Sequence, residues 1–450
     1  MPSFRKEPTI SVGIITEKQI NFDLYGDFKV KGIKKFFSGR FTAEVVNDKI
    51  RCNRGDDLLE AEREIIFEPD DIDLESFLIK DVTIGVRFHW QRKEKQRFQG
   101  TMKLLRNKDK IVVINIIPVE KYLSSVISSE MSAKSSLQML KSLAVVSRSW
   151  LLAQIEKSKS IKMKKEVYSS ESRTVEEFIK WYDREEHELF DVCADDHCQR
   201  YQGISKISMQ MARQAVEETF GLVLLYNNEI CDARFSKSCG GITESFHNVW
   251  EPVVHEYLMS VVDYKYEPEN YNTDFSSEKN AMKWIKGNPA AYCNTKDYKI
   301  LSQILVDYDQ ETKDFFRWQV AYSQSEIAEL LMKNSGIDFG EIIDMIPVER
   351  GNSSRLIKLK IVGSKKNLTV GKELEIRRLL SLTHLYSSAI IIEKQNVDNG
   401  IPGKFVIYGA GWGHGVGLCQ IGAAVMAEKG HSFDEILLHY FRNARLNKIY

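Results

Sequence analysis

Long apolar runs and an excess of charge of either sign are absent from this sequence of 450 residues. No uninterrupted apolar run reaches about 18 residues, the length that a membrane-spanning helix needs, so such a span is excluded. Basic and acidic residues are equal in number, 63 of each, whereas a non-specific nucleic-acid binder needs a cationic surface to displace counterions from phosphates. We therefore expect neither a membrane span nor a nucleic-acid partner.

The sequence also has few cysteines, and its start does not show the pattern of a secretory signal. Seven cysteines are an odd number at low density, which does not indicate a disulfide framework and leaves a metal site as the better use for some of them. The start, MPSFRKEPTISVGI, lacks the apolar core and the small-residue cleavage site of a secretory signal. The first residues therefore give no visible signal peptide.

The residues that are present are those of a soluble globular protein, with 43% hydrophobic and 28% charged side chains. The length predicts two or three folding units. Residues 8–118 alternate short β-type runs such as TISVGII and DVTIGVRFHW with turns, whereas 119–156 has the apolar period of two consecutive helices. A further helix, SMQMARQAVEETFG, precedes a strand. The sequence predicts an α+β fold, with helices and strands arranged around a groove.

The first candidate for chemistry is Glu130, in the segment VEKYLSSVISSEM. On a helix it falls on or beside the apolar stripe of Val126 and Ile127, and not on the solvent face. Burial in an apolar cleft raises a carboxyl pKa, so that the group can donate a proton near neutral pH. From position alone, Glu130 is either such an acid or a helix-end glutamate paired with a cation.

A metal site is indicated by two imidazoles and two thiols within twelve residues: His187, Cys193, His197 and Cys198. Two nitrogens and two sulfurs are a sufficient tetrahedral set for zinc. Their spacing is not that of a common zinc finger, and the adjacent His197 and Cys198 require a turn that aims successive side chains inward. The alternative is a group of incidental surface residues.

The segment FSKSCGGITE is a strand end followed by a glycine pair. Small residues there allow close backbone approach, and Ser236 and Ser238 either bind a sugar or stabilise a turn.

In GWGHGVG, glycines alternate with Trp412, His414 and Val416, as if bare backbone packed on something flat. Trp412 either stacks on a sugar face or belongs to a structural glycine hinge. The segment lacks the context of a phosphate loop, so nucleotide binding is not expected.

Taken in order, these segments resemble the stage II sporulation protein D family, which includes amidase enhancers. The resemblance covers roughly residues 97–262 and 353–442. The resemblance and the residue patterns together divide the chain into four parts: a mostly β N-terminal segment (1–96), the first part of a catalytic-type core with the zinc segment (97–263), an inserted subdomain (264–352) and the second part of the core with GWGHGVG (353–450).

The family resemblance implies a peptidoglycan lytic transglycosylase in which Glu130 is the single acid/base. Its substrate would be the bond between N-acetylmuramic acid and N-acetylglucosamine, and its product a 1,6-anhydro sugar. The nucleophile belongs to the substrate, so no second catalytic carboxylate is needed. The family name also covers amidase enhancers, so the alternative is a non-catalytic module that grips glycan and stimulates a partner amidase.

The resemblance also assigns supporting roles. The His/Cys set matches a structural zinc site of the family, which with four protein ligands would brace the groove. Lys141 and Arg148, in LQMLKSLAVVSRSW, look like groove residues for the glycan, or they form a solvated or ion-paired face. With Ser236, Ser238, Trp412 and His414 they are the candidate substrate contacts.

Two departures from the family pattern are visible. Cys239 stands where the family often has Ser before the glycine pair, and Cys419 stands where Ser usually precedes Gln420. The resemblance implies peptidoglycan and a cell-wall amidase as partners and a location in the cell envelope. A structural protein of another β/α fold, whose glycine-rich motifs serve packing, is the third reading.

Overall fold

The computed structural model describes residues 4–55, 57–85, 91–132, 134–164, 170–181, 187–195, 197–205, 210–304 and 313–450. The chain folds as two compact units. Unit 1 comprises residues 1–133, 186–222 and 448–450, and unit 2 comprises 134–185 and 223–447. Helices and mixed sheets occur together, which confirms the predicted α+β fold.

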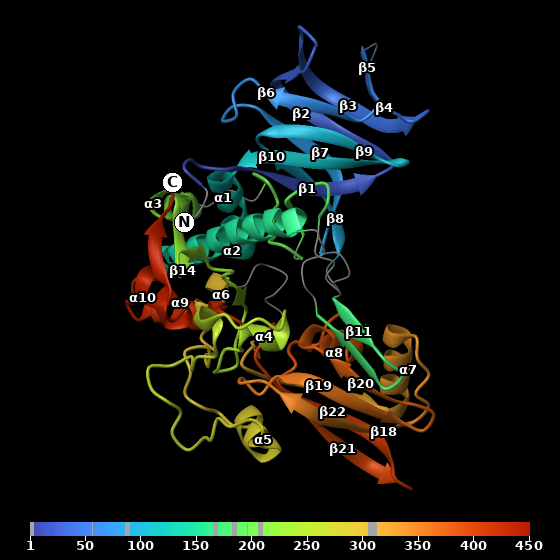
Figure 1. Ribbon diagram of the computed structural model, residues 1–450, viewed down its shortest axis with the longest axis vertical. Helices are drawn as coiled ribbons and strands as arrows, with labels where there is room; N and C mark the ends of the chain where they lie inside the picture. The colour runs from blue at the N-terminus through green and yellow to red at the C-terminus, as the bar shows by residue number, and fades with distance from the viewer. Residues whose placement is uncertain are drawn as a thin grey trace. The chain divides into compact units, whose positions relative to one another are not determined.

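Unit 1 is built on one large sheet, and strands β1 to β10 of this sheet are the blue to cyan arrows of Figure 1. Its main path runs β13-β1-β10-β9-β6-β2-β3-β4-β5, with β7 pairing β2 and β8. The alternating burial along β1 and β2 matches the period of two of a sheet with one buried face. The bounds are β1 Thr9–Glu17, β2 Gln19–Val30, β3 Phe36–Val46, β4 Lys49–Arg54, β5 Asp57–Ala61, β6 Glu64–Pro69, β7 Ser76–Ile84, β8 Arg92–Phe98, β9 Thr101–Asn107, β10 Lys110–Pro118 and β13 Val192–Cys193.

Helix α1, Val119–Glu130, follows β10 directly and packs on α3, Gln210–Glu218. Pro118 occupies the position before the first helical turn, where its fixed φ is tolerated. At the other end Met131 is extended, with φ −123° and ψ 152°, so the helix stops at Glu130. The predicted acid therefore sits at the point where α1 ends.

Unit 2 is organised around a long helix and several small sheets. Helix α2, Leu137–Lys164, packs against α9, Gln420–Glu428, and α10, Phe433–Tyr440. The main sheets are β11-β12-β20-β19-β18 and β17-β22-β21, and a parallel pair joins β16 and β23. The strand bounds are β11 Glu171–Arg173, β12 Glu177–Lys180, β14 Leu222–Tyr226, β15 Glu229–Ile230, β16 Phe235–Ser236, β17 Arg317–Ser323, β18 Ile342–Arg350, β19 Leu356–Gly363, β20 Asn367–Gly371, β21 Ile390–Asp398, β22 Ile401–Ala410, β23 Leu418–Cys419 and β24 Arg445–Lys448.

Short helices complete unit 2. Helix α7, Gln324–Ser335, contacts β17, β18 and β22, and α8, Glu373–Leu379, contacts β19 and β20; both are seen beside these strands in Figure 1. The remaining helices are α4 Phe246–Val249, η1 Glu256–Leu258, α5 Glu278–Lys286 and α6 Tyr298–Ile304.

The β runs of residues 8–118, the two helices within 119–156 and the helix before Gly221 occur where the sequence periodicity indicates them. Two predicted runs extend beyond what is described: residues 86–90 of DVTIGVRFHW, and 208–209 at the start of the helix before Gly221, lie outside the described residues. Within the described part of the chain, no helix combines the length and hydropathy needed to cross a membrane.

Candidate functional site

The carboxylate of Glu130 is held by a loop of unit 1 that is distant in sequence. The backbone N–H of Arg200 donates a hydrogen bond of 3.1 Å to Glu130 Oε1. Glu130 is partly exposed at the end of α1. An acid/base must be held within reach of a substrate proton, and a backbone donor orients the carboxylate without adding another charge.

Buried aromatic rings anchor this loop to α1. Tyr122 of α1 stacks on Tyr201 with ring centroids 5.0 Å apart, and Tyr201 Oη donates to Asn115 Oδ1 at 2.5 Å. Burial, followed by the nearby thiols and Glu130, raises the pKa of Tyr122 well above its usual value. The tyrosine is therefore a neutral packing group between α1 and the loop.

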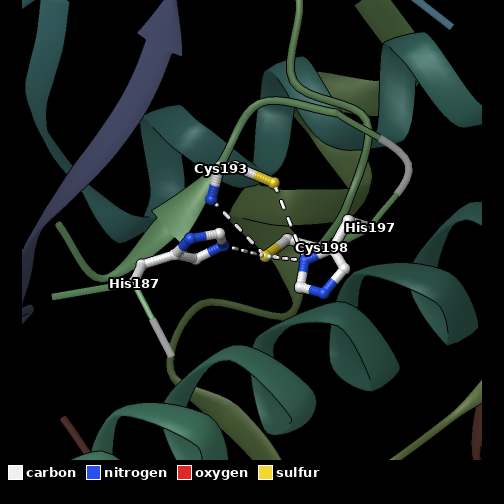
Figure 2. Close-up of side chains that lie close together, drawn as sticks. All are labelled: His187, Cys193, His197 and Cys198. Carbon is white, nitrogen blue, oxygen red and sulfur yellow. Dashed lines mark hydrogen bonds between the residues drawn. The ribbon is translucent and has the colours of Figure 1, made fainter. Parts of the chain in front are cut away.

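The same loop carries the His/Cys cluster, defined here as His187, Cys193, His197 and Cys198. Figure 2 shows the four side chains pointing toward one another. Cys198 Sγ lies 3.4 Å from His187 Nε2 and 3.5 Å from His197 Nδ1, and Cys193 Sγ lies 3.9 Å from His197 Nδ1. The turn needed to aim the adjacent His197 and Cys198 inward is present.

These distances fit a tetrahedral zinc ion. With Zn–S bonds of about 2.3 Å and Zn–N bonds of about 2.0–2.1 Å, sulfur and nitrogen ligands lie about 3.6 Å apart. Hydrogen bonding to Cys198, His187 and His197 lowers the pKa of the Cys193 thiol, and the thiolate is the form that binds metal. The cluster could therefore hold a metal ion.

The two glycine-rich segments meet in unit 2. Ser238 and Trp412 exchange backbone hydrogen bonds of 3.0 and 2.7 Å, and β16 pairs in parallel with β23 through Ser236 and Cys419. The Glu244 N–H also donates to Gly415 O at 2.8 Å. Two motifs that lie far apart in the sequence thus form one backbone platform.

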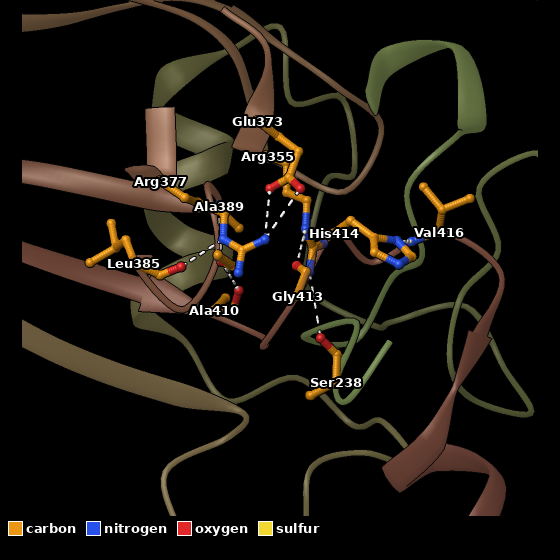
Figure 3. A network of polar contacts seen from close by, with 11 residues as sticks. Ser238, Arg355, Glu373, Arg377, Leu385, Ala389, Ala410, Gly413, His414 and Val416 are labelled. Carbon is orange, nitrogen blue, oxygen red and sulfur yellow. Dashed lines mark hydrogen bonds and ion pairs between the residues drawn. The ribbon is translucent and has the colours of Figure 1, made fainter. Parts of the chain in front are cut away.

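The planar group against which the GWGHGVG backbone packs is the guanidinium of Arg355, which is 1% exposed (Figure 3). It donates to Gly413 O, to Cys239 O at 3.0 Å and to Ser353 Oγ at 2.9 Å. A Cβ atom on Gly415 would lie 2.3 Å from Arg355 Cζ, so any larger residue would collide with the guanidinium. The glycines are required by this contact.

Replacing Arg355 by Met should lower the free energy of unfolding by about 3–5 kcal/mol, because the variant leaves buried carbonyl groups without a donor. Urea unfolding of both proteins measures the change. Arg445→Met, at an exposed position of unit 2, should change it by less than about 0.5 kcal/mol. A loss at Arg355 no larger than at Arg445 would contradict this role.

The two aromatic residues of GWGHGVG are engaged within unit 2. Trp412 stacks on Tyr386 with centroids 4.0 Å apart. His414 Nδ1 accepts a hydrogen bond from the Val416 N–H at 3.0 Å. Burial, and then the charges of Arg234 and neighbouring arginines, lowers the pKa of His414 to about 3. His414 is therefore neutral near pH 7.

Stability should fall as the solution becomes acidic. Burial and Arg442 lower the pKa of His439 to about 4, and both this value and that of His414 lie below the ordinary 6.5. The unfolded chain therefore takes up protons first, so stability is complete above pH 6.5 and is lost as the pH falls toward 4 and 3. Thermal unfolding between pH 7.5 and 5 measures the loss, which should be smaller in His414→Gln; an equal slope in both proteins would contradict this origin.

The other predicted substrate contacts also belong to unit 2. Lys141 Nζ lies 5.6 Å from the centre of the Phe433 ring. Arg148 is fully buried on α2. Ser236 and Ser238 are buried at 6% and 0% exposure, and their hydroxyl groups have no hydrogen-bond partner among the described residues. Glu130 and the His/Cys cluster are brought together in unit 1, and the six substrate candidates lie in unit 2.

Sequence reasoning missed three elements of these sites: the Arg200 N–H, Arg355 and a cleft in unit 2. The cleft has a volume of about 380 Å³, and its lining includes Trp181, His247 and Lys372. Lys372 Nζ donates to His247 O at 2.6 Å, and burial lowers its pKa to about 8. No local pattern marks these residues, since the cleft collects segments that are distant in sequence.

Two family models match the chain. Residues 107–226 match the Stage II sporulation protein model, which includes α1, the His/Cys cluster and α3. Residues 244–417 match a domain of unknown function (DUF8618).

Curated relatives agree with the first match. The amidase enhancer of Bacillus subtilis (strain 168) is 26% identical over 257 residues, which are 52% of this chain and 32% of that protein. The matched region thus spans about a third of that relative. The stage II sporulation protein D of Bacillus amyloliquefaciens is 23% identical over 342 residues, which are 74% of this chain and 75% of that protein. These matches support the stage II sporulation protein D family, whose model covers residues 107–226 of this chain.

Proposed function

We propose that the chain acts on the bacterial cell wall as a peptidoglycan lytic transglycosylase, with Glu130 as its acid/base. The observation that carries the proposal is the hydrogen bond from the Arg200 N–H to Glu130 Oε1. It orients a partly exposed carboxylate at the end of α1, inside the region that matches the family model.

The reaction needs one carboxyl group. Glu130 protonates the glycosidic oxygen between N-acetylmuramic acid and N-acetylglucosamine, and the bond from that oxygen to the muramic C1 breaks. The resulting carboxylate then takes the proton of the muramic C6 hydroxyl group, whose oxygen forms the new bond to C1. Glu130 thus regains the proton that it donated, and no water is consumed. The product carries a 1,6-anhydro end.

The His/Cys cluster serves this site as a brace. We assign it a structural Zn²⁺ held by four protein ligands, which leaves no open position for water activation. Cys198 is two residues from Arg200, so fixing the cluster also fixes the N–H that holds Glu130. The metal acts on the reaction only by positioning.

The second candidate is a non-catalytic module that binds glycan and stimulates a cell-wall amidase. The match to a protein named amidase enhancer favours it. Either function takes peptidoglycan as partner and places the protein in the cell envelope. The predicted contacts Lys141, Arg148, Ser236, Ser238, Trp412 and His414 remain part of this proposal as glycan-binding residues.

One incubation separates the two functions. The protein is mixed with purified glycan strands, either intact or stripped of stem peptides, and 1,6-anhydromuramic ends are measured by mass spectrometry. A parallel reaction adds an N-acetylmuramoyl-L-alanine amidase. Anhydro ends support the transglycosylase, and faster amidase turnover without anhydro ends supports the enhancer. If the protein neither produces anhydro ends nor speeds the amidase on either substrate, both functions are rejected.

A further inference from the structure

A second cluster of potential metal ligands lies in the interior of unit 2, apart from every residue used above for catalysis. It combines three thiols with one carboxylate and is called here the thiol–Asp cluster: Cys239, Asp263, Cys293 and Cys419. All four are at most 2% exposed, and their ligand atoms all lie within 4.8 Å of one another. We propose that the thiol–Asp cluster binds one divalent transition-metal ion, Zn²⁺ by its ligand chemistry.

The ligands come from four segments that are distant in sequence. Cys239 precedes the glycine pair after β16, and Cys419 ends β23, which pairs with β16 in parallel. Asp263 is tied to this platform by its own N–H, which donates to Gly241 O at 2.9 Å. The Cys293 N–H donates to Asp263 Oδ2 at 2.8 Å. Backbone contacts therefore hold the four side chains in place independently of a metal.

The sulfur spacing fits a metal and not a disulfide. Cys239 Sγ lies 3.7 Å from Cys293 Sγ. A tetrahedral zinc with Zn–S bonds of about 2.3 Å keeps its sulfur ligands about 3.8 Å apart, whereas a disulfide needs about 2.05 Å. All seven cysteines of the chain are free. The ligand set, three soft sulfurs and one oxygen, favours zinc over magnesium or calcium, which prefer oxygen ligands.

Supporting contacts around the cluster resemble those that orient metal ligands. Tyr440 Oη donates to Asp263 Oδ1 at 2.6 Å, and the Cys239 N–H donates to Cys419 Sγ at 3.3 Å. A Cβ atom on Gly422 would lie 2.3 Å from both Asp263 Oδ1 and Tyr440 Oη. Such hydrogen bonds set the direction of ligand atoms and are needed for tight metal binding.

The surroundings also offset charge. Three thiolates and a carboxylate exceed the charge of one divalent ion, so the occupied site is anionic. The Arg317 guanidinium lies near enough to interact electrostatically with Cys239 and Cys293, and its N–H groups donate to backbone carbonyls of the surrounding loops, including Gly240 O at 3.1 Å. A buried anionic site with a hydrogen-bonded cation beside it is physically reasonable.

The cluster differs from the His/Cys cluster in place and in expected effect. Cys239 stands where the family often has serine, Cys419 stands where it usually has serine, and Cys293 lies in the segment predicted as an insertion. The family resemblance therefore does not imply this site. A metal there would fasten residues 263–293 to the glycine-rich platform. Its loss should loosen that segment and leave the His/Cys cluster unchanged.

Metal content of the full chain tests the proposal. Protein purified without chelator is analysed by inductively coupled plasma mass spectrometry and by native mass spectrometry. With both clusters filled, the wild type carries two ions per chain, and Cys293→Ser and the double variant Cys239→Ser/Cys419→Ser each carry one. The matched control is Cys231→Ser, a buried free cysteine of unit 2 outside the cluster, which keeps two.

Substitution by Co²⁺ gives a second readout in which all four ligands of the thiol–Asp cluster are kept. The wild type should show the sulfur-to-cobalt charge-transfer band of a site richer in thiolate than the His/Cys cluster, and Cys198→Ser, which removes only the His/Cys cluster, should retain it. If the wild type and Cys293→Ser carry the same number of metal ions, the proposal is overturned. An intact mass lower by two hydrogen atoms with a Cys239–Cys293 crosslink in peptide mapping would also overturn it.

Discussion

Glu130→Gln should reduce release of 1,6-anhydromuramic ends by about 100- to 10,000-fold, the usual contribution of a general acid/base. The amide has nearly the shape of the carboxyl group and its oxygen can still accept the bond from the Arg200 N–H, but it cannot exchange a proton near neutral pH. Binding of glycan strands, measured by sedimentation with purified peptidoglycan, should change little. Loss of turnover with retained binding is the signature of a group that acts on the reacting bond.

The matched control for this variant is Glu217→Gln. Glu217 is an exposed glutamate on α3 in the same unit, so the substitution removes the same charge without changing Glu130. It should retain full turnover. If Glu130→Gln releases anhydro ends at the wild-type rate, Glu130 is not the acid/base.

Cys198→Ser should lose one metal ion per chain and lower the melting temperature by about 6–12 °C. Cys198 is the centre of the His/Cys cluster, since its sulfur lies within 3.5 Å of ring nitrogens of both His187 and His197. Structural zinc contributes about 10–16 kcal/mol of binding energy in zinc-finger peptides. A loss of about 3 kcal/mol in a larger unit already shifts the melting temperature by this amount.

Turnover should fall with the metal, because Arg200 is part of the same loop and its N–H orients Glu130. The control is Cys52→Ser, a fully buried cysteine of unit 1 outside the cluster. It should keep the metal, and chelator should lower its melting temperature as it does in the wild type. Unchanged metal content in Cys198→Ser, or a wild-type melting temperature that chelator does not move, would remove zinc from the proposal.

The glycine-rich motif illustrates how far sequence reasoning reaches. Alternating glycines in GWGHGVG indicate that bare backbone approaches a flat group. The flat group is the guanidinium of Arg355, about 60 residues before the motif. The motif itself does not indicate which residue supplies this group. Trp412, a candidate for stacking on a sugar, stacks on Tyr386 within the protein.

Of the two candidate metal sites, one can be recognised from the sequence and the other only from the tertiary structure. The His/Cys cluster is visible in the sequence because its four members fall within twelve residues, and one turn is enough to gather them. The thiol–Asp cluster is not visible, since Cys239 and Cys419 are 180 residues apart and Asp263 is one of many acidic residues. Only the pairing of β16 with β23 brings its ends together.

By itself the sequence determined the β segment before α1, the helices over 119–156 and before Gly221, the position of Glu130 on an apolar stripe and the presence of a local ligand set. These depend on periodicity and on spacing over a few residues, which act before distant segments meet. Only the tertiary structure decided that the Arg200 N–H holds Glu130, 70 residues away, and that Arg355 joins the two glycine-rich segments. The reason is physical: a hydrogen bond or a metal site depends on distances of a few ångströms, and for residues far apart in sequence these distances are set by the packing of the whole chain.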